Sequence, residues 1–169
     1  MKTLETQRLR LRSWRLADLV ELFEYAKDPE VGPMAGWMPH LNIQVSEGIL
    51  KSFIESGEVW AIAIKETDKV IGSFGIHQDE KRRPSNCRMI GYVIGRNYWG
   101  LGYVPEAVDA VLEYLFNDLE LSIVTVYHFP FNHQSRSVIL KSGFVYEGTL
   151  RKATLAPDGR ILDDVCYSM

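Results

Sequence analysis

The stretch from residue 88 to residue 129 places the strongest constraint on the fold of this chain, because it joins two strands through a helix. Residues 88–94 form a short apolar run that predicts a buried strand, and residues 122–129 predict another. Between them, residues 105–119 carry a wide apolar stripe at helical spacing, and Pro105 suits a first helical turn. This strand–helix–strand passage indicates a sheet that is not purely antiparallel.

The other predicted elements are joined by short connections, which favour antiparallel neighbours. Further strands are predicted over residues 6–14, 59–65, 69–77, 144–155 and 160–168, and further helices over residues 17–27, 46–57 and 135–141. The order of elements is therefore β-α-α-β-β-β-α-β-α-β-β. We expect an α+β fold in which about four helices flank both faces of a mixed, mostly antiparallel sheet of about seven strands.

Two local patterns give sharper expectations. In the first strand, Leu9 and Leu11 alternate with arginines, which predicts buried leucines and places Arg8, Arg10 and Arg12 toward solvent. In the second helix, Ser46 is the expected N-cap. The inward face of that helix is expected to consist of Ile49, Leu50, Phe53 and Ile54.

The composition narrows the class of protein. A chain of 169 residues with 46% hydrophobic and 24% charged residues predicts one globular domain, residues 1–169. Its net charge of −3 argues against direct binding to nucleic acid through bulk charge. No apolar run approaches the roughly 20 residues of a membrane helix, so no membrane partner is expected.

The cysteines and the first residues of the sequence indicate the cellular compartment in which the protein is expected. Cys87 and Cys166 are too few for a disulfide framework, and they give no metal-ligand spacing with the four histidines. The opening residues contain an early acid and no apolar run, unlike a secretory signal. We expect a cytoplasmic protein without a metal site.

The loop between the strand at 88–94 and the helix at 105–119 carries the chemistry. Gly100 and Gly102 allow the backbone to approach a ligand closely, and the following helix offers unpaired N–H groups and a positive dipole end. A phosphate or pyrophosphate is the natural ligand there. The P-loop and dinucleotide patterns are both incomplete, so a tight strand-to-helix turn without a ligand is the alternative.

Several segments together resemble the GNAT superfamily of acyl-CoA-dependent N-acetyltransferases, and in particular its ribosomal-protein N-terminal acetyltransferase subgroup. In the glycine loop, Asn97 stands where the family usually has Gln or Arg. The resemblance covers nearly the whole chain and is carried by residues 5–12, 90–94, 97–107, 132–135 and 141–144. It implies a GNAT-type fold.

The resemblance also implies a binding site for acetyl-CoA as cosubstrate. The backbone amides of Trp99, Gly100, Leu101, Gly102 and Tyr103 should hold the pyrophosphate, with Asn97 in the same motif. The main chain of Tyr92, Val93 and Ile94 should pair with the pantetheine arm, where the family's two central strands splay. Asn132 should hydrogen-bond the pantetheine, although Asn is also a common helix cap, and one residue could serve both purposes.

The implied reaction is direct attack of an amine on the thioester, with backbone N–H groups near Val93 polarising its carbonyl. Many family members have a tyrosine acid where this chain has Ile139, so Ser135 is the candidate acid, with a helix-capping role as the alternative. A common glutamate base is replaced by Met89. His77 and His128 are the candidate substitutes, and each could instead be a structural or surface histidine.

The acceptor is expected to be a protein or peptide α-amine. With a pKa of about 7.7–8.0, roughly a tenth of such an amine is neutral at pH 7, far more than for lysine. The alternatives are an antibiotic or polyamine acceptor, or a catalytically silent acyl-CoA-binding module. Residues 32–41 could line the acceptor side with Met34, Trp37 and Met38, or pack under the first helices.

Two expectations concern surfaces. The basic run at residues 81–83 is expected to be a solvated hairpin tip. An exposed edge strand near the C-terminus would allow two copies to pair as a homodimer.

Overall fold

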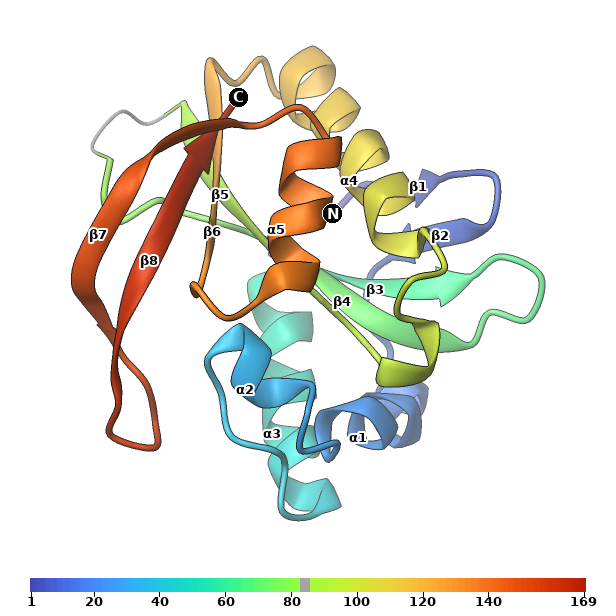
Figure 1. Ribbon diagram of the computed structural model, residues 1–169. Helices are drawn as coiled ribbons and strands as arrows, with labels where there is room; N and C mark the ends of the chain where they lie inside the picture. Colours follow the sequence, from blue (N-terminus) through green and yellow to red (C-terminus); the bar gives the residue numbers. More distant parts are fainter. Residues whose placement is uncertain (83–85) are drawn as a thin grey trace.

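The computed structural model describes residues 1–82 and 86–169. Its eight strands form one sheet in the order β1-β2-β3-β4-β5-β6-β8-β7 (Figure 1). The strands are β1 (Leu4–Glu5), β2 (Leu9–Arg12), β3 (Val59–Ile64), β4 (Val70–His77), β5 (Cys87–Ile94), β6 (Ile123–His128), β7 (Val145–Leu155) and β8 (Ile161–Ser168). Among these described strands β5 and β6 run parallel, and the other neighbours are antiparallel, which confirms the mixed sheet.

Helices cover both faces of the sheet. Within the described ranges they are α1 (Leu19–Ala26), α2 (Gly32–Ala35), α3 (Ile43–Ser56), α4 (Tyr103–Glu113) and α5 (His133–Lys141), with short helical turns η1 (Leu16–Asp18), η2 (Arg96–Tyr98) and η3 (Tyr114–Asp118). Along β3, Trp60 and Ile62 pack into the cluster that includes α4, whereas Ala61 and Ala63 pack with α1 and α3. Successive strand residues point to opposite faces, so the two helix groups lie on opposite sides. None of the helices in the described part of the chain is long and apolar enough to cross a membrane.

The expected numbers of strands and helices are each one too low. The additional strand, β1, precedes the predicted first strand, and a turn in which the Thr6 N–H donates to the Leu9 carbonyl over 2.9 Å joins it to β2. The extra helix, α2, lies within residues 32–41, because Pro33 suits its first turn and Gly36 ends it at φ +88°. The long predicted helix begins at Tyr103 and passes after Glu113 into the π-helical turn η3.

Arg12 does not point to solvent, although Leu9 and Leu11 are buried as predicted. Its guanidinium is only 4% exposed and donates to both carboxylate oxygens of Asp18, over 2.8 and 2.9 Å. A third hydrogen bond of 3.0 Å reaches Asp68. Burial of this charge is tolerated because two carboxylates pair with it.

Ser46 is not the cap of the second long helix. The helix α3 begins three residues earlier, and the Asn42 side chain accepts a hydrogen bond of 3.1 Å from the Val45 N–H. Ser46 is buried inside the helix, 2.7 Å from His40 Nδ1. Of the predicted inward face, Leu50 is fully buried and Phe53 packs beside it, whereas Ile49 and Ile54 are exposed because the buried stripe is narrower than predicted.

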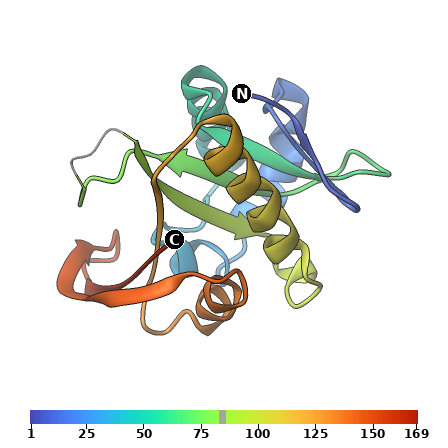
Figure 2. The same cartoon turned by 90° about the horizontal axis from the view of Figure 1, so that it is seen from above.

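The two parallel strands separate halfway along their length. Their pairing ends where Ile90 lies opposite Val126. Beyond that point β5 remains paired with β4 as far as Ile94, while the end of β6, at His128, pairs with β8. The expected splay between the two central strands is therefore present, and the β7–β8 hairpin continues from the β6 side, away from β1 and β2 (Figure 2).

Candidate functional site

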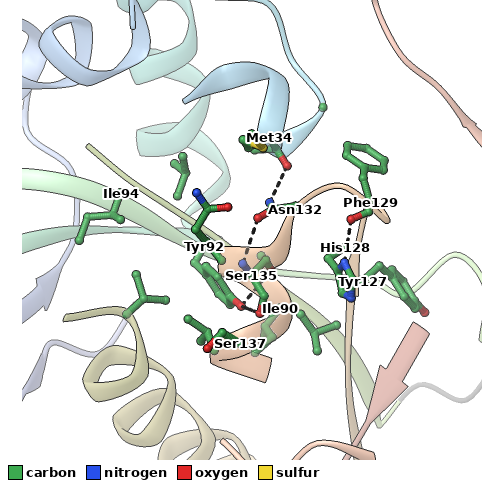
Figure 3. A pocket seen from close by; sticks show the side chains of 18 of the residues that line it. Met34, Ile90, Tyr92, Ile94, Tyr127, His128, Phe129, Asn132, Ser135 and Ser137 are labelled. Atoms are coloured by element: carbon green, nitrogen blue, oxygen red, sulfur yellow. Dashed lines mark hydrogen bonds between the residues drawn. The ribbon is translucent and has the colours of Figure 1, made fainter. Parts of the chain in front are cut away.

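A cavity of about 990 Å³ lies where β5 and β6 separate. It is at the upper end of the usual size range for ligand pockets, about 300–1,000 Å³. Its walls come from the two strands, the glycine loop, the region of α2 and the first turns of α5. Figure 3 shows the part of this lining between β5, β6, α2 and α5. The predicted site residues that line it are His77, Tyr92, Val93, Ile94, Trp99, Gly100, Gly102, Tyr103, His128, Asn132 and Ser135. Asn97 and Leu101 lie outside this lining.

The free edge of β5 presents backbone groups to the cavity. The Gly95 N–H donates to the Ile71 carbonyl over 2.8 Å, which sets the phase of the β4–β5 ladder. Because the bonding direction alternates along an antiparallel ladder, the backbone groups of Val93 point to β4 and those of Tyr92 and Ile94 point to the gap. The Ile94 carbonyl accepts a 2.9 Å hydrogen bond from the Trp99 indole, which holds the start of the glycine loop.

The glycine loop has the geometry of an anion cradle. Gly100 and Gly102 have φ values of +74° and +78°, and Gly102 is the residue from which α4 begins. This left-handed conformation favours glycine because it strains residues with a Cβ. At the start of α4 the N–H groups of Tyr103 and Val104 have no acceptor within the helix, so they are available to an anion held at the loop, whereas Pro105 has no N–H and the Glu106 N–H donates to the Gly102 carbonyl.

Arg8 braces this loop, although the sequence did not single it out. Its Nε donates to Glu106 Oε2 over 2.6 Å, and its Nη1 donates to the Leu101 carbonyl over 2.9 Å. The guanidinium also lies 4.5 Å from the centre of the Tyr103 ring. Burial alone would raise the pKa of Glu106, but hydrogen bonds from Thr6 and Arg8 outweigh it and lower that pKa. Arg8 therefore neutralises a carboxylate that stands beside the cradle.

Asn132 is the N-cap of α5. Its Oδ1 accepts a 3.0 Å hydrogen bond from the Ser135 N–H, and its Nδ2 donates to the Met34 carbonyl over 2.9 Å (Figure 3). The capping role that the sequence left open is thus realised. The same side chain ties α5 to α2 across the cavity, and a contact with pantetheine stays a prediction.

Two hydroxyl groups meet on the α5 side of the cavity. Tyr92 Oη lies 3.1 Å from Ser135 Oγ (Figure 3). Burial raises the pKa of Tyr92, which keeps the phenol protonated through the neutral range. Ile139, one helical turn beyond Ser135, is buried and supplies no polar group.

His128 is buried with one ring nitrogen unpartnered. Its Nδ1 lies 2.8 Å from the Phe129 carbonyl and must donate to it, because a carbonyl oxygen can only accept. Its Nε2 is buried and has no hydrogen-bond partner among the described residues. Burial lowers the pKa of His128, and this effect outweighs the hydrogen bond to the Phe129 carbonyl, which would raise it. The neutral ring therefore offers a lone pair within the cavity wall.

His77 and His128 lie on opposite faces of the sheet. His77 is directly opposite Met89 in the β4–β5 register, so the two side chains share a face. His128 is in step with Val126 and Ile90 on the other face. The side chain of His77 is 40% exposed, and its Nδ1 lies 3.7 Å from Glu58 Oε2. The two candidate histidines thus approach one cavity from opposite sides.

A polar wall on the His77 side was not predicted. Asp79 is 1% exposed and accepts hydrogen bonds of 2.8 Å from Thr125 and 2.6 Å from Tyr127. Burial would raise the pKa of Asp79, but these hydrogen bonds lower it overall. Asp164 also lines the cavity and pairs with Lys81 over 2.9 Å. The sequence signal that could have indicated this wall was the aspartate in the polar loop after β4. Its partners Thr125 and Tyr127 are remote in sequence, so their contacts with Asp79 could not be predicted.

The basic run is exposed in part, as expected of a solvated turn, since Lys81 is exposed and Arg82 is half-buried. Its charges are nevertheless paired, Lys81 with Asp164 and Arg82 with Glu147. Arg83 lies outside the described residues.

The stretch at residues 32–41 divides between the two roles that the sequence left open. Met34 lines the cavity, Trp37 packs with the α1–α3 cluster, and Met38 is 54% exposed.

Comparison with known proteins gives one consistent family. The family model described as an acetyltransferase (GNAT) domain matches residues 8–145. An uncharacterized N-acetyltransferase, p20, from Bacillus licheniformis is 32% identical, over 100% of this chain and 96% of that protein. The [Ribosomal protein uS5]-alanine N-acetyltransferase of Escherichia coli is 26% identical, over 93% of this chain and 81% of that protein.

Solved structures agree in fold. An acetyltransferase of the GNAT family from Bacillus anthracis superposes with a TM-score of 0.89 at 20% identity, covering 99% of this chain and 98% of that one. The expected GNAT-type architecture is confirmed by this match.

Proposed function

The chain belongs to the GNAT family of N-acetyltransferases, and from that premise we propose that it acetylates the α-amine of a protein or peptide N-terminus. GNAT acetyltransferases use acetyl-CoA, and the cavity of this chain fits it. The observation that carries the proposal is the free edge of β5 beside the glycine cradle, at Gly100 and Gly102, within one large cavity. A strand edge suits the amide-containing pantetheine arm, and the cradle suits its pyrophosphate.

The residues that would hold acetyl-CoA follow from this arrangement. The cradle amides from Gly100 to Tyr103 would bind the pyrophosphate, whereas the Trp99 N–H already donates to the Arg96 carbonyl over 3.1 Å. The backbone groups of Tyr92 and Ile94 would pair with the arm. The thioester supplies an activated acetyl group. An amide of β5 facing the gap would stabilise negative charge that develops on its carbonyl oxygen. From the register this role falls to Ile94 or Tyr92 rather than to Val93.

We assign the two proton transfers to opposite faces of the sheet. His77 would accept the proton of the amine, because it shares a face with Met89, the position that the family often gives to its glutamate. Ser135, in the first turn of α5, would donate toward the departing sulfur. Two groups that approach one cavity from opposite sides can act as base and acid without competing.

Two arguments support an α-amine acceptor. The E. coli relative, 26% identical, is named a [Ribosomal protein uS5]-alanine N-acetyltransferase, which makes a protein amine the acceptor of a relative. An imidazole is a modest base, and an amine with a pKa of about 7.7–8.0 requires less help than a lysine at about 10.4.

A small cationic amine, such as a polyamine, is the second candidate acceptor. The observation in its favour is that the carboxylates of Asp79 and Asp164 line the cavity. Both are engaged by partners within the chain, which weakens their attraction for an external cation.

An acceptor screen tests the proposal. The chain is incubated with acetyl-CoA and matched acceptors: peptides with a free N-terminus, the same peptides blocked at the N-terminus but carrying an internal lysine, polyamines, and aminoglycosides. Mass spectrometry of the products and release of free thiol are the measurements. We expect acetyl transfer to the free N-terminus and little to the blocked peptide. Transfer to polyamines or aminoglycosides alone would replace the α-amine proposal, and acetyl-CoA binding without any transfer would favour a silent binding module.

A further inference from the structure

The hydroxyls of Tyr92 and Ser135 form a pair that connects the middle of β5 to the start of α5. Their oxygens lie 3.1 Å apart, and both residues line the cavity. Tyr92 Oη also lies 3.4 Å from the Ser135 carbonyl oxygen, so the phenol is held close to one residue of the helix. The Tyr92 ring lies 5.8 Å from that of Phe74, packed against the buried core.

The direction of this hydrogen bond determines what Ser135 can do. Each hydroxyl has one proton and can also accept, and a phenol is a stronger acid than an aliphatic alcohol, so Tyr92 is the better donor of the two. When Tyr92 donates to Ser135 Oγ, the serine proton is free to point into the cavity. The Ser135 backbone is already fixed by Asn132, which accepts from its N–H over 3.0 Å.

Among residues 1–82 and 86–169, no other side-chain hydroxyl contacts Ser135 Oγ. The next turn of α5 on the same face carries Ile139, which is buried and apolar. Ser135, as the proton donor on this side of the cavity, therefore depends on a tyrosine of β5, Tyr92, because α5 carries no tyrosine on this face.

We propose that Tyr92 is a positioning residue for proton delivery, holding the Ser135 hydroxyl toward the departing sulfur and replacing the proton that it gives up. This inference rests on the proposed function. As the new nitrogen–carbon bond forms and the carbon–sulfur bond breaks, the sulfur takes the proton of Ser135 Oγ. The serine oxygen takes the proton of Tyr92 Oη in the same step as Tyr92 Oη takes a proton from solvent, so no free phenolate is formed, while the amine proton leaves through the base.

The expected effect is moderate, since a thiol with a pKa of about 8.5 can leave partly without protonation. We expect Tyr92→Phe to lower kcat with acetyl-CoA by about ten- to a hundredfold, at the lower end of general acid–base effects. Acetyl-CoA binding should be unchanged, because the backbone of β5 is retained. Ser135→Ala should behave similarly, and the double variant should be no worse than either single one, because the two hydroxyls act as a unit.

The test compares donors with different leaving groups. Rates with acetyl-CoA and with S-acetylthiophenol, whose thiol is more acidic, are measured for wild type, Tyr92→Phe, Ser135→Ala and the double variant. Tyr146→Phe is the matched control, because it removes a similar 3.0 Å hydroxyl pair, with Thr149, outside the cavity. A more acidic thiol needs no donor, so the loss should be confined to acetyl-CoA.

Each outcome of this comparison supports or overturns the role of Tyr92. Absence of acetyl transfer by wild type would overturn the proposed function and this inference with it. An active wild type with no loss in Tyr92→Phe, an equal loss for both donors, or additive losses in the double variant would overturn the inference alone. Thermal melts and acetyl-CoA binding of each variant separate misfolding from lost chemistry, and the Ser135→Ala series repeats the test should Tyr92→Phe not fold.

Discussion

Arg8 and Glu106 form an ion pair across the mouth of the glycine cradle, with Arg8 Nε 2.6 Å from Glu106 Oε2. The same guanidinium donates to the carbonyl of Leu101, between the two cradle glycines, over 2.9 Å. The turn before β2 is thereby joined to the loop that begins α4. Because the pair is partly exposed, it contributes little to the free energy of unfolding, and its main effect is to hold the loop in place.

We predict that Arg8→Ala raises the KM for acetyl-CoA by about tenfold, the equivalent of one charge-assisted hydrogen bond, while kcat changes little. The loss should be smaller with S-acetylpantetheine, which lacks the pyrophosphate. Steady-state kinetics with both donors provide the measurement. Arg160→Ala is the control, since it removes a comparable 2.7 Å pair with Asp158 in the β7–β8 turn. An equal loss with both donors would contradict a role at the cradle.

Gly102 and Gly57 allow the cradle to be separated from backbone strain in general. Both have left-handed φ values, +78° and +63°, but Gly57 ends α3 away from the cavity. Alanine at either position should lower the free energy of unfolding by roughly 1 kcal/mol and Tm by about 2–4 °C. Only Gly102→Ala should also weaken CoA binding, measured by calorimetric titration. If both variants bind CoA as wild type does, the cradle geometry is not required.

Asn132 and Asn42 provide a second matched pair, because each caps a helix with a similar hydrogen bond, of 3.0 and 3.1 Å. Alanine at either position should destabilise the chain by about 1 kcal/mol. We expect Asn132→Ala alone to raise the KM for acetyl-CoA, because it also releases the Met34 carbonyl and frees α5 at the cavity wall. Melting curves and kinetics measure the two effects. A KM unchanged in Asn132→Ala would leave the residue a cap and nothing more.

Local periodicity was sufficient for most of the elements and for a mixed, mostly antiparallel sheet, but not for β1, for α2 or for the order of the strands in the sheet. The strand, glycine loop and helix around Gly102 are where their spacing predicts, since turn and helix-start preferences act over a few residues. Arg12 was misplaced because its burial depends on Asp18 and Asp68, and Asp68 is remote in sequence. A period of two describes which face a residue occupies, but not whether a distant carboxylate covers that face.

The same limit applies to the site. Tyr92 with Ser135, and His77 with Met89, are contacts that arise only once β4, β5 and α5 are assembled. The motifs in the sequence were sufficient to predict most of these residues as site residues. Their pairing is a property of sheet register and helix docking, which no window of neighbouring residues contains.

The two histidines should differ in their effect on rate. We expect His77→Gln to lower kcat by about 10²–10⁴-fold, the range for loss of a general base, with acetyl-CoA binding intact. His128→Gln should lower kcat less, since His128 lies on the face away from Met89. Single-turnover acetyl transfer to an N-terminal peptide is the measurement. A larger loss in His128→Gln would move the base to the other face of the sheet.

His128 should also make stability depend on pH. Burial lowers its pKa below the ordinary value of 6.5, so the unfolded chain takes up this proton before the folded chain does. The contribution is fully present above pH 6.5 and is lost as pH falls through the lowered pKa. We predict that His128→Phe, which keeps the ring stacked on Tyr167, reduces the decline in unfolding free energy below pH 6.5. Urea unfolding of both proteins across that range measures it. Parallel curves would mean that the unpartnered Nε2 is protonated as readily in the fold as in water, and such a nitrogen could not serve as the neutral lone pair that its burial implies.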